Sequence, residues 1–282
     1  MTILPANRMP RIFDSALGRS FSTSSCPQFF DQMLTNKTFT DCFPMSFYLQ
    51  SSASYVATIR SATNNTKPLE DILDTSCNGI SSFDSCSAVM KDLAQEMMQN
   101  STCGIDFQRN NSNVIQAYSN LVAYPVVYQT TCLKTAASKS PSSVPSHSSN
   151  GNGTEYCYIN ALYNEALASE SFLYLLSLGT SFPTGPGYGS PSCSECTRQV
   201  MQIYHTFTGD AKQPIRQTYE GAAQVIDQNC SAGFAPPDLL EVETQNSTNT
   251  SSKANFGVRP HPTSIVHVLL LSLFLSAIFT VL

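Results

Sequence analysis

Apolar residues recur along much of this chain at spacings of three and four, the period of a helix that packs one face against a core. The clearest case is residues 82–100, where Phe83, Cys86, Met90 and Leu93 share a face. No segment shows the strict alternation of a half-buried strand or a two-residue hairpin turn. The pattern therefore predicts an all-α fold, with helical segments at residues 26–36, 40–62, 67–77, 82–100, 114–133, 156–178, 193–207 and 214–230.

Two prolines lie within these predicted helices. In residues 40–62, Asp41 can cap the helix and Pro44 falls in its first turn, where proline is tolerated. Pro125 lies inside residues 114–133, where it removes a backbone donor and predicts a kink or a split.

Polar stretches divide the chain into regions. Residues 1–25 show no periodicity and are predicted to be disordered, whereas residues 26–236 form a cysteine-rich helical domain. Residues 135–154 are rich in Ser, Pro and Gly and predict an exposed internal loop. Residues 237–252 predict a disordered stalk rich in Ser, Thr and Asn.

Ten cysteines in 282 residues change the picture, because stable disulfides belong to the oxidising secretory route. All ten are predicted to form disulfides: Cys26, Cys42, Cys77, Cys86, Cys103, Cys132, Cys157, Cys193, Cys196 and Cys230. The net charge is −5, and the 15 basic residues are scattered singly. Without a basic cluster to neutralise phosphates, nucleic acid is not an expected partner.

Eight Asn-x-Ser/Thr triplets point to the same compartment. Glycosylation is predicted at seven of them: Asn36, Asn64, Asn100, Asn110, Asn152, Asn246 and Asn249. The eighth, Asn229, is followed by Cys230 at the predicted end of a packed helix, so low occupancy is expected there.

The region from Asn246 to Leu282 has the pattern of a glycosylphosphatidylinositol (GPI) anchor signal. A polar run leads to the uncharged segment Ile265–Leu282, and residues 253–282 are predicted to be removed on maturation. Ser252 is the preferred attachment residue and Asn255 the second, because small residues follow each at the required spacing. An ordinary membrane-spanning helix is the alternative.

Residues 1–25 contain no apolar run of the length that a secretory signal peptide needs. A leader is therefore expected upstream of Met1. A tail-anchored protein whose domain faces the cytosol is the alternative, but it leaves the cysteines and acceptor triplets unexplained.

Three segments carry a resemblance to a known group: SFSTSSCPQFF, NLVAYPVVYQTTCL and CSECTRQVMQIY. Together with the order of the cysteines, they resemble fungal GPI-anchored surface proteins that share a cysteine-rich domain of unknown function. The similarity covers Phe13 to Phe234, and the members of that group begin with a secretory leader, from which this sequence departs. The resemblance implies a location and an architecture but no activity.

Few residues offer catalytic or metal-binding chemistry, and no catalytic residue, metal ligand or cofactor is predicted. The segment Cys193-Ser-Glu-Cys196 could be a redox pair or half of a zinc site, but structural disulfides are preferred in a secreted domain. His205 is the only histidine within residues 26–236 outside the polar loop, and no partner for it is apparent.

Two groups of carboxylates could serve a glycosidase. They are Glu70 with Asp71 and Asp74, and Asp92 with Glu96. Both groups are interpreted as solvated helix faces, because the chain also has no tryptophan to line a sugar cleft.

A disulfide from Cys230 to the CSEC segment is predicted, with Cys193 favoured. The last two helices are joined by a few residues around Gly209 and Pro214, so they should pack antiparallel, and equal lengths bring Cys230 level with Cys193. The alternative is that both CSEC cysteines bond to the earlier half, for example to Cys157.

These observations predict a non-enzymatic, N-glycosylated, GPI-anchored protein on the outer face of the plasma membrane, with transfer to the cell wall as a further step. Its expected role is structural, adhesive or binding, and its expected partners are the membrane, through the anchor lipid, and cell-wall glycans or surface proteins. A polysaccharide-modifying enzyme and a module binding lipids or other small molecules are the alternatives.

Overall fold

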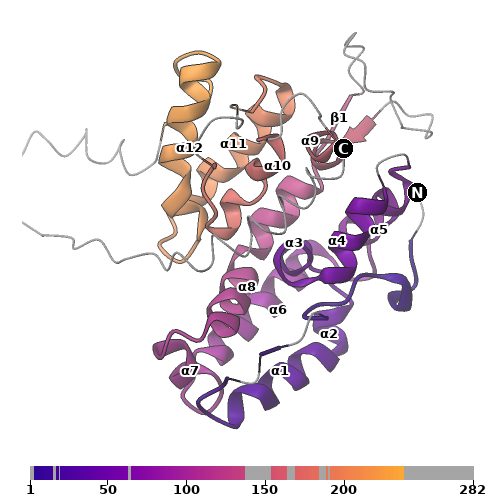
Figure 1. Cartoon of the computed structure of the whole chain (residues 1–282), viewed down its shortest axis with the longest axis vertical. Helices are drawn as coiled ribbons and strands as arrows, with labels where there is room; N and C mark the ends of the chain where they lie inside the picture. The colour runs from indigo at the N-terminus through magenta and orange to yellow at the C-terminus, as the bar shows by residue number, and fades with distance from the viewer. Residues whose placement is uncertain are drawn as a thin grey trace, which may run out of the picture. The chain divides into compact units, whose positions relative to one another are not determined.

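The computed structural model describes residues 3–14, 17–18, 20–62, 65–136, 154–163, 169–183, 189 and 191–237. These residues are mostly helical, which confirms the predicted class (Figure 1). The α-helices are α1 (Ser25–Thr35), α2 (Lys37–Thr40), α3 (Met45–Ser51), α4 (Ala53–Ser61), α5 (Lys67–Cys77), α6 (Phe83–Met97), α7 (Gly104–Gln108), α8 (Ser112–Thr131), α9 (Cys157–Leu162), α10 (Glu170–Leu173), α11 (Glu195–Phe207) and α12 (Ile215–Asn229). Two 3₁₀ helices are η1 (Ala6–Arg8) and η2 (Leu176–Leu178).

Local sequence explains several helix starts. The hydroxyl of Ser82 accepts a hydrogen bond from the Ser85 amide at the start of α6, and Ser194 caps α11 in the same way. The side chain of Asn111 accepts from two amides at the start of α8. These caps satisfy backbone donors that have no partner within the helix.

The single helix predicted over residues 40–62 is wrong. The chain makes two helices there, α3 and α4, and the break falls at Ser52, which has extended backbone angles and caps α4. Asp41 ends α2 rather than starting a helix, and Pro44 precedes α3 as its N-cap residue.

Helix α8 is not split at Pro125 but continues from Ser112 to Thr131. The proline removes one intrahelical bond, and the packing on both sides of α8 keeps the helix intact. In Figure 1, α8 passes between the group α1, α2, α6 and α7 and the group α9 to α12.

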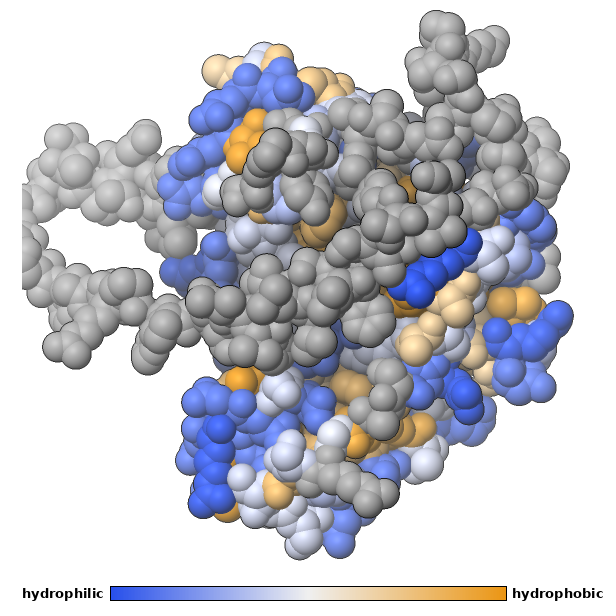
Figure 2. All heavy atoms as spheres, viewed as in Figure 1, coloured by the Kyte–Doolittle hydropathy of each residue, from blue (hydrophilic) through white to orange (hydrophobic). Residues whose placement is uncertain are grey.

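Two apolar clusters form the core, and α8 contributes to both. The first cluster joins α3, α4 and α5 to the second half of α8 and to α9 through α12. The second joins α1, α2, α6 and α7 to the first half of α8. Most described residues on the face in Figure 2 are hydrophilic, and apolar atoms appear there in smaller patches.

The first cluster is rich in buried tyrosines. The hydroxyls of Tyr55 and Tyr158 lie 3.2 Å apart, and the ring of Tyr158 packs edge-on against Tyr174. Tyr163 donates to the Ile59 carbonyl at 2.9 Å, and burial raises the pKa of Tyr163 to about 12. Their phenol groups are therefore held neutral inside the fold.

The prediction that residues 1–25 are disordered is wrong for residues 3–14, which pack on the helices as an ordered arm. Met9 is 6% exposed, and the Phe13 amide donates to the Ser51 carbonyl. The carboxylate of Asp14 accepts from the first two amides of α4, at 2.6 and 3.0 Å. The arm therefore supplies a cap to a helix that begins 39 residues later.

The region after α8 also differs from the prediction. Strands β1 (Lys134–Ala136) and β2 (Thr154–Tyr156) pair antiparallel at the two ends of the predicted loop. The helix predicted over residues 156–178 is instead the series α9, α10 and η2, which ends at Gly179 with a left-handed backbone (φ 84°). Strands of three residues are too short to produce a visible alternation in the sequence.

Candidate functional site

All ten cysteines pair into five disulfides, so the predicted disulfide-stabilised domain is confirmed. The bonds are Cys26–Cys103, Cys42–Cys86, Cys77–Cys132, Cys157–Cys196 and Cys193–Cys230. They join segments that lie between 37 and 77 residues apart in the sequence. Cross-links of this span remove much of the freedom of the unfolded chain.

The two cysteines of the CSEC segment bond in different directions. Cys193 bonds to Cys230, as predicted, and this bond ties the start of α11 to the end of α12. Cys196 bonds to Cys157 at the start of α9. Because each sulfur belongs to a separate cross-link, the segment is neither a redox pair nor a pair of thiolate ligands.

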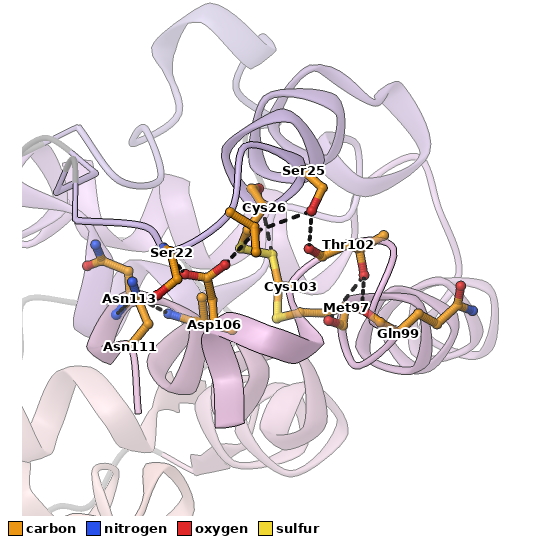
Figure 3. The surroundings of a disulfide bond; sticks show 12 residues. Ser22, Ser25, Cys26, Met97, Gln99, Thr102, Cys103, Asp106, Asn111 and Asn113 are labelled. Atoms are coloured by element: carbon orange, nitrogen blue, oxygen red, sulfur yellow. Dashed lines mark hydrogen bonds between the residues drawn. A yellow bond between two sulfur atoms is a disulfide. The ribbon is translucent and has the colours of Figure 1, made fainter. Parts of the chain in front are cut away.

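A buried carboxylate lies beside the Cys26–Cys103 bond (Figure 3). Asp106 has 0% of its surface exposed, and it accepts hydrogen bonds from the Ser22 amide and from the Thr23 hydroxyl at 2.6 Å. Sequence reasoning missed this residue. Its position one helical turn after Cys103 was the available signal, because such a residue faces the same side as the cross-linked cysteine.

Asp74 shows that the carboxylates of α5 are not a solvated face. Its side chain accepts from the Tyr156 hydroxyl at 2.7 Å, and the residue is 4% exposed. The Lys134 ammonium lies 3.4 Å from this carboxylate and 4.0 Å from the centre of the Tyr156 ring. Burial, followed by the bond to Asp74, raises the pKa of Tyr156. Glu70 and Asp71 bond to residues within one turn of α5.

A third buried carboxylate, Glu170, is 7% exposed and accepts from the amide and the hydroxyl of Ser192. Ser192 precedes Cys193, whereas Asp74 lies three residues before Cys77. The three acids therefore have the same structural role: each accepts hydrogen bonds that connect a segment next to a disulfide to another part of the fold.

The remaining candidates lie apart from one another. Asp92 and Glu96 are exposed on α6, in agreement with the prediction of a solvated face. His205 is partly buried on α11, with its ring 6.1 Å from that of Tyr219. Among the described residues, no group of three or more His, Cys, Asp or Glu side chains is placed to hold a metal ion.

Three of the four acceptor asparagines in the described part of the chain lie in exposed connections between helices. Asn36 joins α1 to α2, Asn100 follows α6, and Asn110 joins α7 to α8. Asn36 caps α2 through its carbonyl oxygen, which leaves the amide nitrogen for a sugar. The other predicted sites, Asn64, Asn152, Asn246 and Asn249, lie outside the described residues.

Asn229 is exposed at the end of α12, so burial does not shield it. Its amide nitrogen donates to the Pro191 carbonyl at 3.3 Å, and the next residue, Cys230, is fixed by its disulfide. These two restraints, rather than burial, oppose the extended conformation that sugar transfer needs.

A family model described as a domain of unknown function (DUF7729) matches residues 8–239. The chain belongs to that family. The match begins within the ordered N-terminal arm, so the domain starts earlier than the predicted boundary at Cys26. No curated protein and no solved structure matches the chain.

Ser252, Asn255 and the apolar segment Ile265–Leu282 lie outside the described residues. Within the described ranges, no helix has the length and apolar character needed to cross a membrane.

Proposed function

We propose that this protein is a non-enzymatic, N-glycosylated module of the fungal cell surface. A GPI anchor holds it on the outer face of the plasma membrane, and its role there or in the cell wall is structural, adhesive or binding. The observation that carries the proposal is the pairing of all ten cysteines, because five disulfides form and persist in the secretory route.

Three further features support this location. Asn36, Asn100 and Asn110 lie in exposed connections between helices, where a glycan can be carried without disturbing the core. The polar run after Asn246 and the uncharged segment that follows match the pattern of an anchor signal. The resemblance to anchored fungal surface proteins points to the same place.

The anchor is tested by expressing the protein, behind a secretory leader, in a fungal host. Phosphatidylinositol-specific phospholipase C should release it from washed membranes, and the mature protein should lack residues 253–282. Replacing both Ser252 and Asn255 with leucine should abolish this release, because attachment needs small residues. Retention in the membrane after phospholipase treatment, with residues 253–282 still present, would refute the anchor.

The absence of catalysis is tested separately. The purified ectodomain is incubated with wall glucans and chitin, and the products are analysed by mass. Intact polysaccharides together with saturable binding support the proposed role. Cleaved or transferred glycan chains would instead establish an enzyme.

A further inference from the structure

The turn between α7 and α8 has a defined geometry around an acceptor asparagine. The backbone N–H of Asn110 donates to the backbone carbonyl of Phe107 at 2.9 Å, and the backbone N–H of Asn111 donates to the backbone carbonyl of Asp106 at 3.0 Å. These two bonds form the Schellman ending of a helix. Asn110 occupies the left-handed position of the motif (φ 58°), which glycine usually fills and asparagine tolerates.

Apolar side chains beside this turn remain partly exposed. The ring of Phe107 packs edge-on against Tyr118, with centroids 5.2 Å apart and planes at 69°. Both rings are only partly buried. Ile115 lies one turn before Tyr118 on α8 and is 37% exposed. Ile115 and Tyr118 are three residues apart and share a face of α8, and Tyr118 contacts Phe107, which precedes Asn110 by three residues; we call these three side chains the apolar patch.

We propose that the glycan on Asn110 is a structural part of the domain. Its first N-acetylglucosamine packs on the ring of Phe107 and covers the patch formed with Ile115 and Tyr118. The C–H groups of a pyranose ring suit the negative face of an aromatic ring, and covering the patch removes apolar surface from water. This inference rests on the proposed glycosylation and gives one glycan a specific role.

The backbone makes this contact specific to Asn110. The backbone hydrogen bond from the Asn110 N–H to the Phe107 carbonyl holds the two residues one turn apart. A sugar attached to the Asn110 side chain therefore lies within reach of the Phe107 ring. No aromatic residue stands two or three positions before Asn36 or Asn100, where methionine or leucine occurs. Glycans at those two sites therefore lack an equivalent partner and serve as controls.

Two variants remove this glycan by different routes. Asn110→Gly deletes the acceptor but keeps a residue suited to the left-handed position. Ser112→Ala keeps Asn110 and deletes the exposed hydroxyl that the glycosyltransferase needs. Alanine suits a helix start that Asn111 already caps, so backbone effects alone predict no loss of stability from either variant. Asn100→Gln removes a control glycan.

The test compares melting temperatures of glycosylated proteins from one host that adds high-mannose chains. Both Asn110→Gly and Ser112→Ala should lower Tm by about 2–4 °C, and Asn100→Gln should not. Trimming the wild-type protein with endoglycosidase H, which leaves one sugar on each asparagine, should preserve its Tm. In a Phe107→Leu background, Ser112→Ala should no longer lower Tm.

Unchanged or higher Tm values for both Asn110→Gly and Ser112→Ala would overturn the inference, as would an equal loss in the Phe107→Leu background. Glycopeptide mapping separates this inference from the proposed function. An unmodified Asn110 with glycans on Asn36 and Asn100 overturns the structural role alone. Unmodified asparagines at all three positions overturn the proposed glycoprotein as well.

Discussion

Replacing Asp106 with asparagine should destabilise the domain far more than a surface change of the same chemistry. Asp106 is completely buried, and its two carboxylate oxygens accept from the Ser22 amide and the Thr23 hydroxyl. Asparagine keeps one acceptor oxygen and turns an NH₂ group toward the other donor. A hydrogen bond to a charged group contributes about 1.5–3 kcal/mol, so the expected loss in unfolding free energy is roughly 2–3 kcal/mol.

A loss of this size should lower Tm by roughly 5–10 °C in a domain of about 200 residues. The assay is thermal unfolding followed by circular dichroism with all disulfides intact. Asp92→Asn is the matched control, because Asp92 is exposed on α6 and its replacement should change stability by less than about 0.5 kcal/mol.

Hydrogen exchange provides a local readout at the same site. The Ser22 amide should be protected in the wild type and should exchange faster in Asp106→Asn, because its acceptor is weakened. The neighbouring Cys26–Cys103 bond keeps the two segments together in both proteins, so the difference reports on the carboxylate itself. Equal Tm values for Asp106→Asn and Asp92→Asn would refute the reasoning.

Three further outcomes are expected. Burial raises the pKa of Asp14, but hydrogen bonds from Ser54 and from the start of α4 outweigh it and hold that pKa below its usual value. Asp14 therefore contributes stability above about pH 4 that is lost on further acidification, so Asp14→Asn should lower Tm at pH 7 and have less effect at pH 3. Tyr163, with a pKa of about 12, should make stability fall as pH rises from about 10 toward 12, and Tyr163→Phe should reduce this fall in alkaline unfolding curves. Cys193 is the only exposed cysteine of the ten, so its bond to Cys230 should be the first that a dilute reductant opens. Brief reduction followed by an alkylating reagent should therefore label Cys193 and Cys230 first, and earlier labelling of Cys26 would contradict this order.

Helices whose limits depend on nearby residues could be predicted from the sequence. The segment 67–77 agrees with α5 at both ends, and Ser82 caps α6 at the predicted start. The α11–α12 pair was predictable for the same reason, because two adjacent helices of similar length must bring Cys193 and Cys230 together. These predictions needed only periodicity, capping and chain length.

Features that depend on distant partners could not be predicted in this way. Ser52 interrupts an apolar pattern that continues on both sides, and the Asp14 carboxylate that stabilises the break lies 39 residues before Ala53, the first residue of α4. Asp74 and Asp106 resemble ordinary surface acids in the sequence. Their burial could not be predicted from nearby residues, because it depends on hydrogen-bond donors that lie 82 and 84 residues away in the sequence: Tyr156 for Asp74 and Ser22 for Asp106.

The sequence by itself determined the helical class and the positions of the acceptor triplets, because composition and short-range spacing carry that information. Its ten cysteines also predicted that the domain is held by disulfides. Only the tertiary structure decided how the other eight cysteines pair and which carboxylates are buried. Both depend on contacts between segments that lie tens of residues apart along the chain. Such contacts form only when the whole core packs, since burial of a charge or a ring is a property of its surroundings.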